Sequence, residues 1–350
     1  MIGILAMPGV SHSIAYNLMR MGCPKVMVTL VLLLGWCDFG VEGPYAFFEV
    51  FSGKGAATRV WHRAGYQCAS FDFEYSKKGM NFLGHAGFAL SILTVMKLMP
   101  NGVVLLAPQC SSWVVASRGT SRRSFINPMG FEGYKFVTDG NQMIARLVLL
   151  LMVVIAKCGI YVIENPAGTL LWQHERFQYF CNKMAWVYTI SFWMAHFGSP
   201  TPKRTTVMSN SKFVGMLHMG PFSRSKCKKS STTRQYRDRQ GRKRFVGTSK
   251  LKASQVYPAG FGTRLLDVYK KANHEEIRRD LRKCYAVDPK LSDRENFVAY
   301  PIGDLWLDAN VLDVIVYIRK YKGLTIPDSW LAAIDNFIAD ALRTLDDSPE

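Results

Sequence analysis

Apolar strand-like runs alternate with helix-like stretches along the chain from about residue 46 onward. The first run covers residues 46–51, a helical stretch covers 56–64, and a short strand covers 67–73. A strand followed by a helix and then by another strand is typical of a parallel sheet with crossover helices. The alternation therefore predicts an α/β fold with a mostly parallel central sheet and helices on both of its faces.

The same alternation continues to about residue 208. Residues 103–107 are apolar without interruption, which is typical of a strand that is covered on both faces. We predict further helices over 86–98 and 141–158, and further strands over 160–163, 185–194 and 205–208. These elements place a single sheet-forming core within residues 44–220.

Composition restricts the partners that such a core can have. The 350 residues are 49% hydrophobic, which is enough to build a substantial core, and 44 Lys and Arg outnumber 26 Asp and Glu, giving a net charge of +18. A surplus of this size favours a polyanion such as nucleic acid or an anionic membrane face. The eight cysteines lack the spacing of a zinc site or of a disulfide framework, so we expect no metal and a reducing compartment.

Two apolar runs, at 26–36 and 147–156, are each too short to cross a bilayer. We therefore expect no membrane partner and interpret the second run as part of a buried core helix. The first run lies in an N-terminal extension, residues 1–43, and a signal-like segment is the alternative interpretation of it.

A basic segment, residues 221–256, interrupts the alternation, and a helical region, 257–350, with an amphipathic helix at 330–345, follows it. The only acid in the basic segment is Asp238, and its cations are Arg224, Lys226, Lys228, Lys229, Arg234, Arg237, Arg239, Arg242, Lys243, Arg244, Lys250 and Lys252. The composition predicts an exposed loop or disordered arm that binds nucleic acid phosphates, a solvated arm without fixed contacts being the alternative. The run 241–244 also favours a nuclear location.

A glycine turn with two nearby acids predicts a pocket for a nucleoside cofactor. The turn is Phe51-Ser52-Gly53-Lys54-Gly55, directly after a strand and before a helix. Glu49 lies near the end of that strand, and Asp72 follows the next strand about 20 residues later, where a ribose-binding carboxylate is expected in such folds. Glycines allow the backbone to approach a ligand closely.

Two further loops follow predicted strands, and ligand-binding residues of open α/β sheets lie at that end of the strands. The first loop is Pro108-Gln109-Cys110, whose thiol is a candidate nucleophile. The second is Glu164-Asn165-Pro166, whose carboxylate can bind a ring nitrogen or move a proton. Arg204, beside Lys203, can contact a phosphate or a carboxylate.

Taken in order, these pieces over residues 45–210 resemble the motif series of the cytosine-5 DNA methyltransferases. The resemblance implies a Rossmann-like class I methyltransferase fold, S-adenosylmethionine as cofactor, and DNA rather than RNA as substrate. It implies that Cys110 attacks C6 of the cytosine, that Glu164 holds N3 and that Arg204 assists them. The implied cofactor-binding residues are Glu49, Phe51, Ser52, Gly53, Gly55, Asp72, Asn81 and Pro108.

The resemblance also places nucleic-acid contacts outside the core motifs. The basic segment occupies the position of the family's target-recognition region. The arginines that follow Cys110 could clamp a DNA backbone beside an extruded base, a mobile charged loop being the alternative. The implied nucleic-acid-binding residues are Arg118, Arg122, Arg123, Arg242, Lys243 and Arg244. The sequence departs from the family pattern at Asn81, Gln109, Ser111 and Pro166.

Three alternatives share parts of this pattern. A methyltransferase acting on RNA or a small molecule needs the cofactor pocket but not Cys110. A non-catalytic methyltransferase fold would use the basic segment to bind nucleic acid. An NAD-dependent enzyme is disfavoured because the glycine turn lacks the spacing G-x-G-x-x-G.

Overall fold

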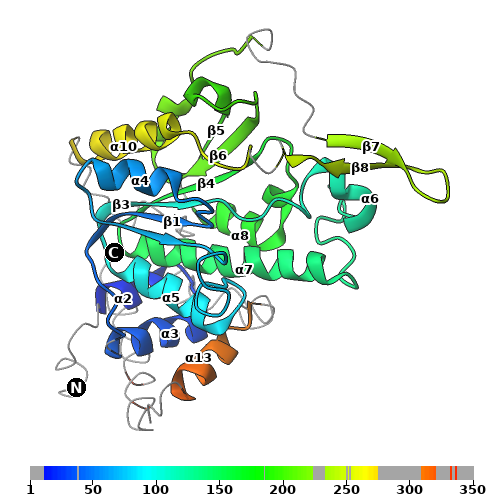
Figure 1. The fold of residues 1–350 in the computed structure, drawn as a ribbon. Helices are drawn as coiled ribbons and strands as arrows, with labels where there is room; N and C mark the ends of the chain where they lie inside the picture. Colours follow the sequence, from blue (N-terminus) through cyan, green and yellow to red (C-terminus); the bar gives the residue numbers. More distant parts are fainter. Residues whose placement is uncertain are drawn as a thin grey trace.

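A six-stranded sheet in the order β2-β1-β3-β4-β6-β5 forms the centre of the computed structural model (Figure 1). The model describes residues 12–37, 39–184, 186–223, 233–249, 251, 254–274, 309–320, 332 and 336. The strands are β1 (Tyr45–Val50), β2 (Cys68–Phe71), β3 (Leu98–Leu106), β4 (Ile160–Pro166), β5 (Tyr188–Trp193) and β6 (Arg204–Ser209). Strands β1 to β4 are parallel. The predicted α/β fold with a mostly parallel sheet is therefore confirmed.

Strand β6 runs antiparallel to both of its neighbours, β4 and β5. The connection from Trp193 to Arg204 contains only a 3-10 turn, η3 (Met194–Phe197), and the left-handed Gly198. Met194 N donates to Lys203 O over 2.9 Å and closes this connection. A parallel pairing needs a crossover of a dozen or more residues, so this short connection produces a hairpin.

Helices cover both faces of the sheet, as Figure 1 shows. One face carries α2 (His12–Arg20), α3 (Lys25–Trp36), α5 (His85–Met96), α7 (Lys135–Ala156), α8 (Glu175–Lys183) and α13 (Val311–Lys320). The other carries α4 (Ala56–Arg63), α10 (Ala259–His274) and the 3-10 segment η4 (Lys212–Leu217). Strand residues alternate between the two apolar clusters, Phe48 and Val50 joining one and Phe47 the other.

The apolar runs of the sequence are core helices of this fold. In α3, seven side chains are buried. Helix α7 has 22 residues and, by length and composition only, could cross a membrane. Within the most apolar window of α7, 83% of the residues are buried inside the protein. Asn17 of α2 donates to Ala156 O at the end of α7 over 3.1 Å. The described residues of the N-terminal extension therefore belong to the central core.

Two elements begin earlier than the sequence predicts. Strand β3 begins at Leu98 because the Pro100-Asn101-Gly102 break forms a bulge inside it, where the register jumps from Tyr45↔Leu98 to Phe47↔Val103. Proline is tolerated in a strand at such a bulge. Helix α7 begins at Lys135, six residues before its predicted start. The predicted helix at 330–345 lies outside the described residues, except for 332 and 336.

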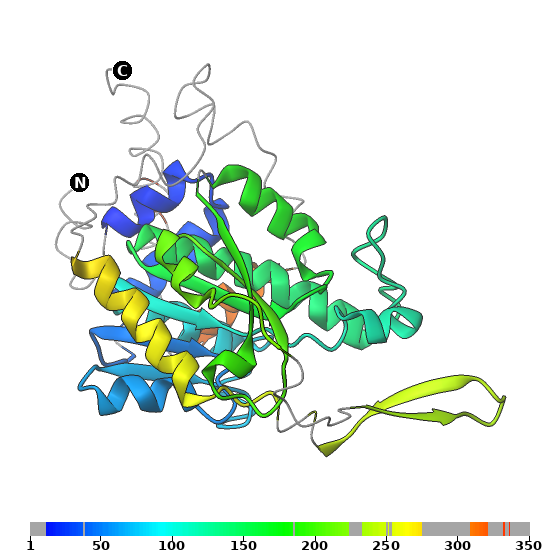
Figure 2. The same cartoon turned by 90° about the horizontal axis from the view of Figure 1, so that it is seen from above.

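Part of the basic segment forms a β-hairpin that extends away from the body of the molecule (Figure 2). Its strands are β7 (Thr233–Arg237) and β8 (Lys243–Gly247). Asp238 N donates to Arg242 O over 3.0 Å and Gly241 N donates to Asp238 O over 2.9 Å, which closes the turn. The expected loop or disordered arm is exposed, but between Thr233 and Gly247 its backbone is regular.

Short 3-10 and helical segments complete the described chain: η1 (Val115–Ser117) and α6 (Arg118–Ser121) follow β3, and η2 (Leu171–Gln173) precedes α8.

Candidate active site

The four parallel strands end at one edge of the sheet and bring the predicted site residues together there. The glycine turn follows β1, and Asp72 follows β2. Cys110 lies in the loop after β3, and Glu164 lies near the end of β4. These strands are direct neighbours in the order β2-β1-β3-β4. This carboxyl edge is where open α/β sheets bind their ligands.

The glycine turn is tight and leaves open space beside its backbone. Phe51, Gly53 and Gly55 all have positive φ, at 61°, 53° and 60°. Gly55 N donates to Ser52 O over 2.8 Å, and nothing lies within 4 Å of the position where Gly53 would carry a Cβ. A left-handed conformation is strained at Phe51, a residue that is not glycine, and such strain gathers at functional sites. A ligand can therefore approach Gly53 closely on the side where a Cβ would project.

Asp72 connects the glycine turn to the loop that follows β2. Its Oδ2 accepts from Gly53 N over 2.7 Å, and its Oδ1 accepts from Glu74 N over 2.9 Å. The side chain is half-buried. Each carboxylate oxygen has two lone pairs, so both retain capacity for a hydroxyl group.

Glu49 does not reach this open space. Its side chain is fully buried, and its Oε2 accepts from Thr58 N over 2.8 Å and from Thr58 Oγ1 over 2.6 Å. Thr58 lies in the first turn of α4, where a carboxylate satisfies free N–H groups and the helix dipole. Burial raises the pKa of Glu49, while the hydrogen bonds from Thr58 act to lower it. Glu49 therefore fixes α4 against the glycine turn, and its contact with a cofactor stays a prediction.

The remaining predicted cofactor residues border the same turn. Ser52 is buried, and its Oγ lies 3.1 Å from the hydroxyl of Tyr75. Phe51 is half-buried, with its ring 5.0 Å from that of Phe82. Asn81 uses its Oδ1 to accept from Leu83 N over 3.0 Å, in the turn before α5.

The loops that carry Cys110 and Glu164 are joined directly. Asn165 Nδ2 donates to Pro108 O over 3.1 Å in the buried interior. Glu164 is 4% exposed, its Oε1 lies 3.1 Å from Lys203 Nζ, and its Oε2 accepts from the Tyr257 hydroxyl over 2.9 Å. A buried carboxylate with a cation and a hydroxyl donor is held in one orientation.

The Cys110 thiol lies within electrostatic reach of this cluster. Burial raises the pKa of Cys110, the positive charge of Lys203 lowers it, and the negative charge of Glu164 raises it. Cys110 therefore shares one microenvironment with Glu164 and Lys203. The convergence of Cys110 and Glu164 expected from the sequence is present.

Tyr257 is the residue of this cluster that the sequence did not reveal. It lies just before α10, it is 8% exposed, and its pKa is raised by burial and by the neighbouring Glu164. Its only sequence signal was the Tyr257-Pro258 pair at the start of the helical region. Its position depends on how α10, which begins two residues later, packs against α4.

Arg204 lies on the other side of strand β6 from this cluster. It is exposed, and its guanidinium lies 5.9 Å from the centroid of the Trp193 ring. Successive residues of a strand point to opposite faces, so the side chains of Lys203, just before β6, and of Arg204, its first residue, point in opposite directions. Lys203 contacts Glu164, and the expected role of the exposed Arg204 stays a prediction.

Arg123 is a core residue and not a backbone clamp. It is 2% exposed, and its Nη1 donates to Pro128 O over 2.6 Å and to Asn141 Oδ1 over 2.8 Å. Its Nη2 donates to Ser112 Oγ over 3.3 Å and to Val137 O over 3.1 Å. Burial lowers its pKa to about 10. The structure does not support the expected nucleic-acid contact at Arg123, because its side chain is buried and both of its terminal nitrogens already donate inside the protein.

The other two arginines of this loop are closer to the surface. Arg122 is exposed and lies over the ring of Phe131, with its guanidinium 4.7 Å from the ring centroid. Arg118 is half-buried, and its guanidinium lies 5.5 Å from the centroid of the Phe125 ring. The contact of these two arginines with nucleic acid stays a prediction.

Trp113 anchors the Cys110 loop between two buried side chains. The Arg123 guanidinium lies 3.4 Å from the centroid of its ring, and the His174 ring lies 5.7 Å away. Leu170 N donates to Trp113 O over 2.9 Å. A cation over an indole face is attracted by the ring quadrupole. The loop that carries Cys110 is thus fixed on both sides.

Because His174 is buried, we expect the protein to lose stability in acid. It is fully buried, it caps α8 by accepting from Arg176 N over 3.2 Å, and burial followed by the nearby Arg176 and Arg123 lowers its pKa to about 3. The unfolded chain binds the proton at a pKa of about 6.5, so protonation favours unfolding as the pH falls from 6.5 towards 3. We expect the protein to lose about 2–3 kcal/mol of unfolding free energy through His174 between pH 7 and pH 4.5.

Urea unfolding of the wild type and of His174→Asn at the two pH values measures this loss. Asparagine retains an N-cap acceptor but does not titrate. The variant is expected to lose about 2–3 kcal/mol less than the wild type between the two pH values. Equal losses in the two proteins would show that His174 does not sense the pH.

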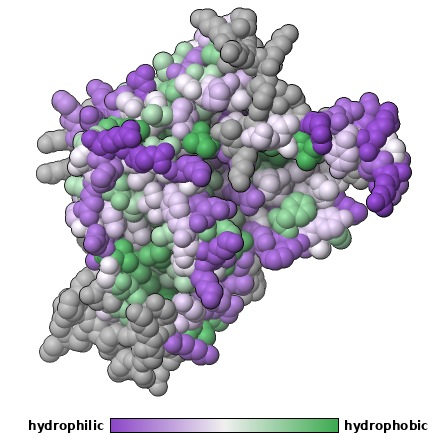
Figure 3. Space-filling view, viewed as in Figure 1, coloured by the Kyte–Doolittle hydropathy of each residue, from purple (hydrophilic) through white to green (hydrophobic). Residues whose placement is uncertain are grey.

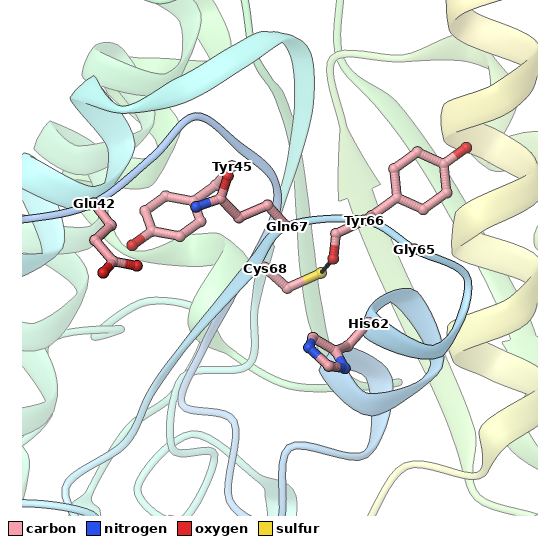
Figure 4. Close-up of a pocket in the computed structure, with 7 residues that line it drawn as sticks. All are labelled: Glu42, Tyr45, His62, Gly65, Tyr66, Gln67 and Cys68. Carbon is pink, nitrogen blue, oxygen red and sulfur yellow. Dashed lines mark hydrogen bonds between the residues drawn. The ribbon is translucent and has the colours of Figure 1, made fainter.

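A separate pocket lies at the opposite, amino edge of the sheet (Figure 4). Its volume is about 490 Å³, and its lining includes Tyr45 at the start of β1 and Cys68 at the start of β2. Cys68 Sγ donates to Tyr66 O over 3.2 Å, and burial followed by the charge of Glu49 raises its pKa to about 12. The raised pKa disfavours the nucleophilic thiolate form of Cys68 in this pocket.

No group of three or more His, Cys, Asp or Glu residues that could hold a metal ion occurs in the described part of the chain. No protein-family model matches the chain, and a search of curated proteins finds no match.

Proposed function

We propose that this protein is an S-adenosylmethionine-dependent methyltransferase that acts on C5 of cytosine in nuclear DNA. The observation that carries the proposal is the hydrogen bond from Asn165 to Pro108, which joins the Cys110 and Glu164 loops at the edge of the sheet that also carries the glycine turn. A thiol, a carboxylate and a nucleoside-type turn at one edge supply what cytosine methylation needs. The fold class supports the proposal without proving it.

The carboxyl edge fits the adenosine part of the proposed cofactor. The space beside Gly53 accepts a close ligand, and Asp72 retains acceptor capacity for ribose hydroxyl groups. Phe51 supplies an aromatic surface next to the turn. The cofactor would supply an electrophilic methyl group at this edge.

Cys110 is the proposed nucleophile. As a thiolate it forms a bond to C6 of a cytosine that has left the base stack, and the electron pair of the C5–C6 double bond becomes available at C5. The cofactor would supply the methyl group that C5 takes, and the electron pair of the broken methyl–sulfur bond would leave with the sulfur. Loss of the C5 proton to a base restores the double bond and releases the Cys110 thiolate.

Lys203 and Tyr257 position Glu164 for this chemistry. Together they contact both carboxylate oxygens and hold Glu164 in one orientation, which supports its proposed contact with the cytosine ring. Lys203 also favours the thiolate form of Cys110, because its charge lowers the pKa of that thiol. Preorganised charges of this kind stabilise a transition state without reorganisation.

A second candidate is a methyltransferase fold that binds nucleic acid without turnover. The burial of Cys110 favours it, because burial is the largest influence on the thiol and raises its pKa. A raised pKa reduces the fraction of nucleophilic thiolate at neutral pH. This candidate predicts that the chain binds cofactor and DNA but transfers no methyl group.

Binding of S-adenosylhomocysteine tests the cofactor site directly. We expect a concentration of 100 times Kd to raise the melting temperature of the wild type by about 3–5 °C. Asp72 accepts from two backbone N–H groups, and in Asp72→Asn the side-chain NH₂ group would face one of them. We therefore expect the Kd for S-adenosylhomocysteine to rise about tenfold.

The matched control is Glu74→Gln, an exposed neighbour on the same loop, for which we expect an unchanged Kd. Isothermal titration measures all three constants. A wild type that binds NAD but not S-adenosylhomocysteine would refute the cofactor assignment.

A further inference from the structure

The loop between α6 and α7, residues 122–134, extends from the body of the molecule and carries apolar side chains at its end (Figure 2). Phe125 is 68% exposed, and its neighbour Ile126 is 98% exposed. Single apolar side chains scattered over a surface are ordinary, whereas adjacent exposed ones usually mark an interaction site. We call these two residues the apolar tip.

Hydrogen bonds to the core hold the apolar tip in place. Phe131 N donates to Ser121 O over 2.9 Å and closes the base of the loop. From the interior, Arg123 Nη1 donates to Pro128 O over 2.6 Å. A surface that is ordered before binding loses less conformational entropy when its partner arrives. The loop is therefore built to present the tip in a fixed position.

Cations and aromatic rings lie behind the apolar tip. The Arg118 guanidinium lies 5.5 Å from the centroid of the Phe125 ring, and the Arg122 guanidinium lies 4.7 Å from that of Phe131. The Phe131 and Tyr134 rings are 4.9 Å apart, and both side chains are exposed. In Figure 3 this region, below the hairpin at the right of the view, shows green residues bordered by purple ones.

The segment that carries the tip contains no acid. Residues 111–131 hold three arginines and neither Asp nor Glu. Apolar side chains at the end, aromatic rings behind them and unopposed cations at the base follow the layers of an anionic bilayer, which are acyl chains, interface and phosphates. The net charge of +18 adds a long-range attraction to such a surface.

A bilayer fits this tip better than a protein partner does. Protein interfaces commonly bury about 800 Å² on each partner, across surfaces of complementary shape. Here the apolar residues lie at the end of an extended loop, and Ile126, at 98% exposure, contacts almost nothing of its own chain. Such an end needs no complementary surface when the partner is a fluid layer.

We propose that the loop 122–134 anchors this protein to the surface of an anionic membrane. Phe125 and Ile126 enter the boundary of the acyl chains, while Arg118 and Arg122 bind lipid phosphates. This peripheral contact requires no membrane-spanning helix. It goes beyond the proposed function, and it departs from the expectation of no membrane partner, which was drawn from the lengths of two apolar runs.

Matched removal of apolar side chains tests the tip. The tip variant combines Phe125→Ser and Ile126→Ser. The control variant combines Leu312→Ser and Val316→Ser on α13, at positions that are 65% and 41% exposed. Both variants keep the net charge of the wild type, and equal melting temperatures confirm that both are folded.

The measurement is co-sedimentation with phosphatidylcholine vesicles that contain about 30% phosphatidylserine. In about 0.5 M salt the attraction of the net charge is largely screened, so the binding that remains reports the apolar tip. There we expect the tip variant to bind on the order of 100-fold more weakly than the wild type, because two large side chains no longer leave water. The control is expected to stay within about twofold.

A second pair of variants tests the phosphate contacts. Arg118→Gln with Arg122→Gln is expected to weaken vesicle binding by about tenfold or more at low salt. The control pair, Arg63→Gln with Lys270→Gln, removes two exposed charges elsewhere and is expected to change binding by about twofold or less.

A photoreactive side chain identifies what the tip touches. Phe125→p-benzoylphenylalanine, irradiated in a mixture of vesicles and duplex DNA, is expected to attach to lipid acyl chains, as measured by peptide mass spectrometry. The same side chain at Leu312 is expected to give no lipid adduct.

Equal vesicle affinities of the tip and control variants would overturn the proposal, as would complete release of the wild type in about 0.5 M salt. So would attachment of the Phe125 probe to DNA, or to a second copy of the chain, instead of lipid. None of these measurements uses the cofactor or methyl transfer, so a failure of the methyltransferase proposal leaves their outcome unchanged.

Discussion

Cys110→Ser is expected to abolish the transfer of tritium from labelled S-adenosylmethionine to cytosine in DNA, lowering the rate on the order of 10⁴-fold or more. Serine at this position has no accessible anion at neutral pH, so no bond to C6 forms and C5 stays unreactive. The contacts of Glu164 to Lys203 and Tyr257 do not involve the thiol and are expected to persist. Scintillation counting of the recovered DNA measures the loss.

The control for this variant is Cys181→Ser, at a half-buried thiol on α8 that lies 3.8 Å from Met208 Sδ. We expect the control to transfer methyl groups at a rate within about twofold of the wild type, since Cys181 lies outside the carboxyl edge. Binding of S-adenosylhomocysteine is expected to be unchanged in both variants. Retention of methyl transfer in Cys110→Ser would favour a methyltransferase that uses no covalent nucleophile.

Arg123→Ala is expected to reduce the free energy of unfolding by roughly 3–5 kcal/mol. The guanidinium is buried and bonded to the side chains of Asn141 and Ser112, both of which would lose a partner in a dry interior. Its removal also leaves a cavity against the Trp113 ring, which it contacts at 3.4 Å from the centroid. Urea denaturation followed by tryptophan fluorescence and circular dichroism measures the change.

Arg122→Ala is the matched control, because this neighbouring arginine is exposed. Its stability is expected to stay within about 0.5 kcal/mol of the wild type. A second test is Arg123→Lys, which keeps the charge but not the planar set of donors, and is expected to be destabilised as well. Similar stabilities of Arg123→Ala and Arg122→Ala would show that Arg123 is not the anchor of the Cys110 loop.

The core of the fold was predictable because its signal is local. A strand that is buried on both faces requires an apolar run, and residues 103–107 form such a run within β3. The direction of β6 was not predictable from composition, since it depends on the short connection through η3. The role of α3 was equally hidden, because an apolar helix has the same sequence pattern whether it packs on a sheet or enters a membrane.

The candidate site shows the same division between local and long-range information. Parallel strands bring their carboxyl ends to one edge, so the strand assignments place Cys110 and Glu164 at the same edge, and the pairing of β3 with β4 makes them neighbours. The inward turn of Glu49 towards Thr58 depends on how α4 sits on β1. The contact from Tyr257 to Glu164 joins residues 93 positions apart, and no local pattern encodes it.

The charged surfaces were the least predictable part. Arg122 and Arg123 are adjacent in the sequence, yet one is exposed and the other is 2% exposed. The left-handed conformation of Arg122, with φ of 56°, reverses the chain between them and directs Arg123 inward. The hairpin similarly depends on the turn that Asp238 forms, which its highly charged composition conceals.

The most direct test of the account is a covalent trap with DNA that contains 5-fluorocytosine. Fluorine at C5 cannot leave as a proton does, so the bond between the enzyme and C6 persists once the methyl group has been transferred. In the presence of S-adenosylmethionine we predict a complex that survives denaturing electrophoresis, with the DNA attached to Cys110 by peptide mass spectrometry. Absence of the complex, from a chain that binds both S-adenosylhomocysteine and DNA, would contradict the proposed cytosine chemistry.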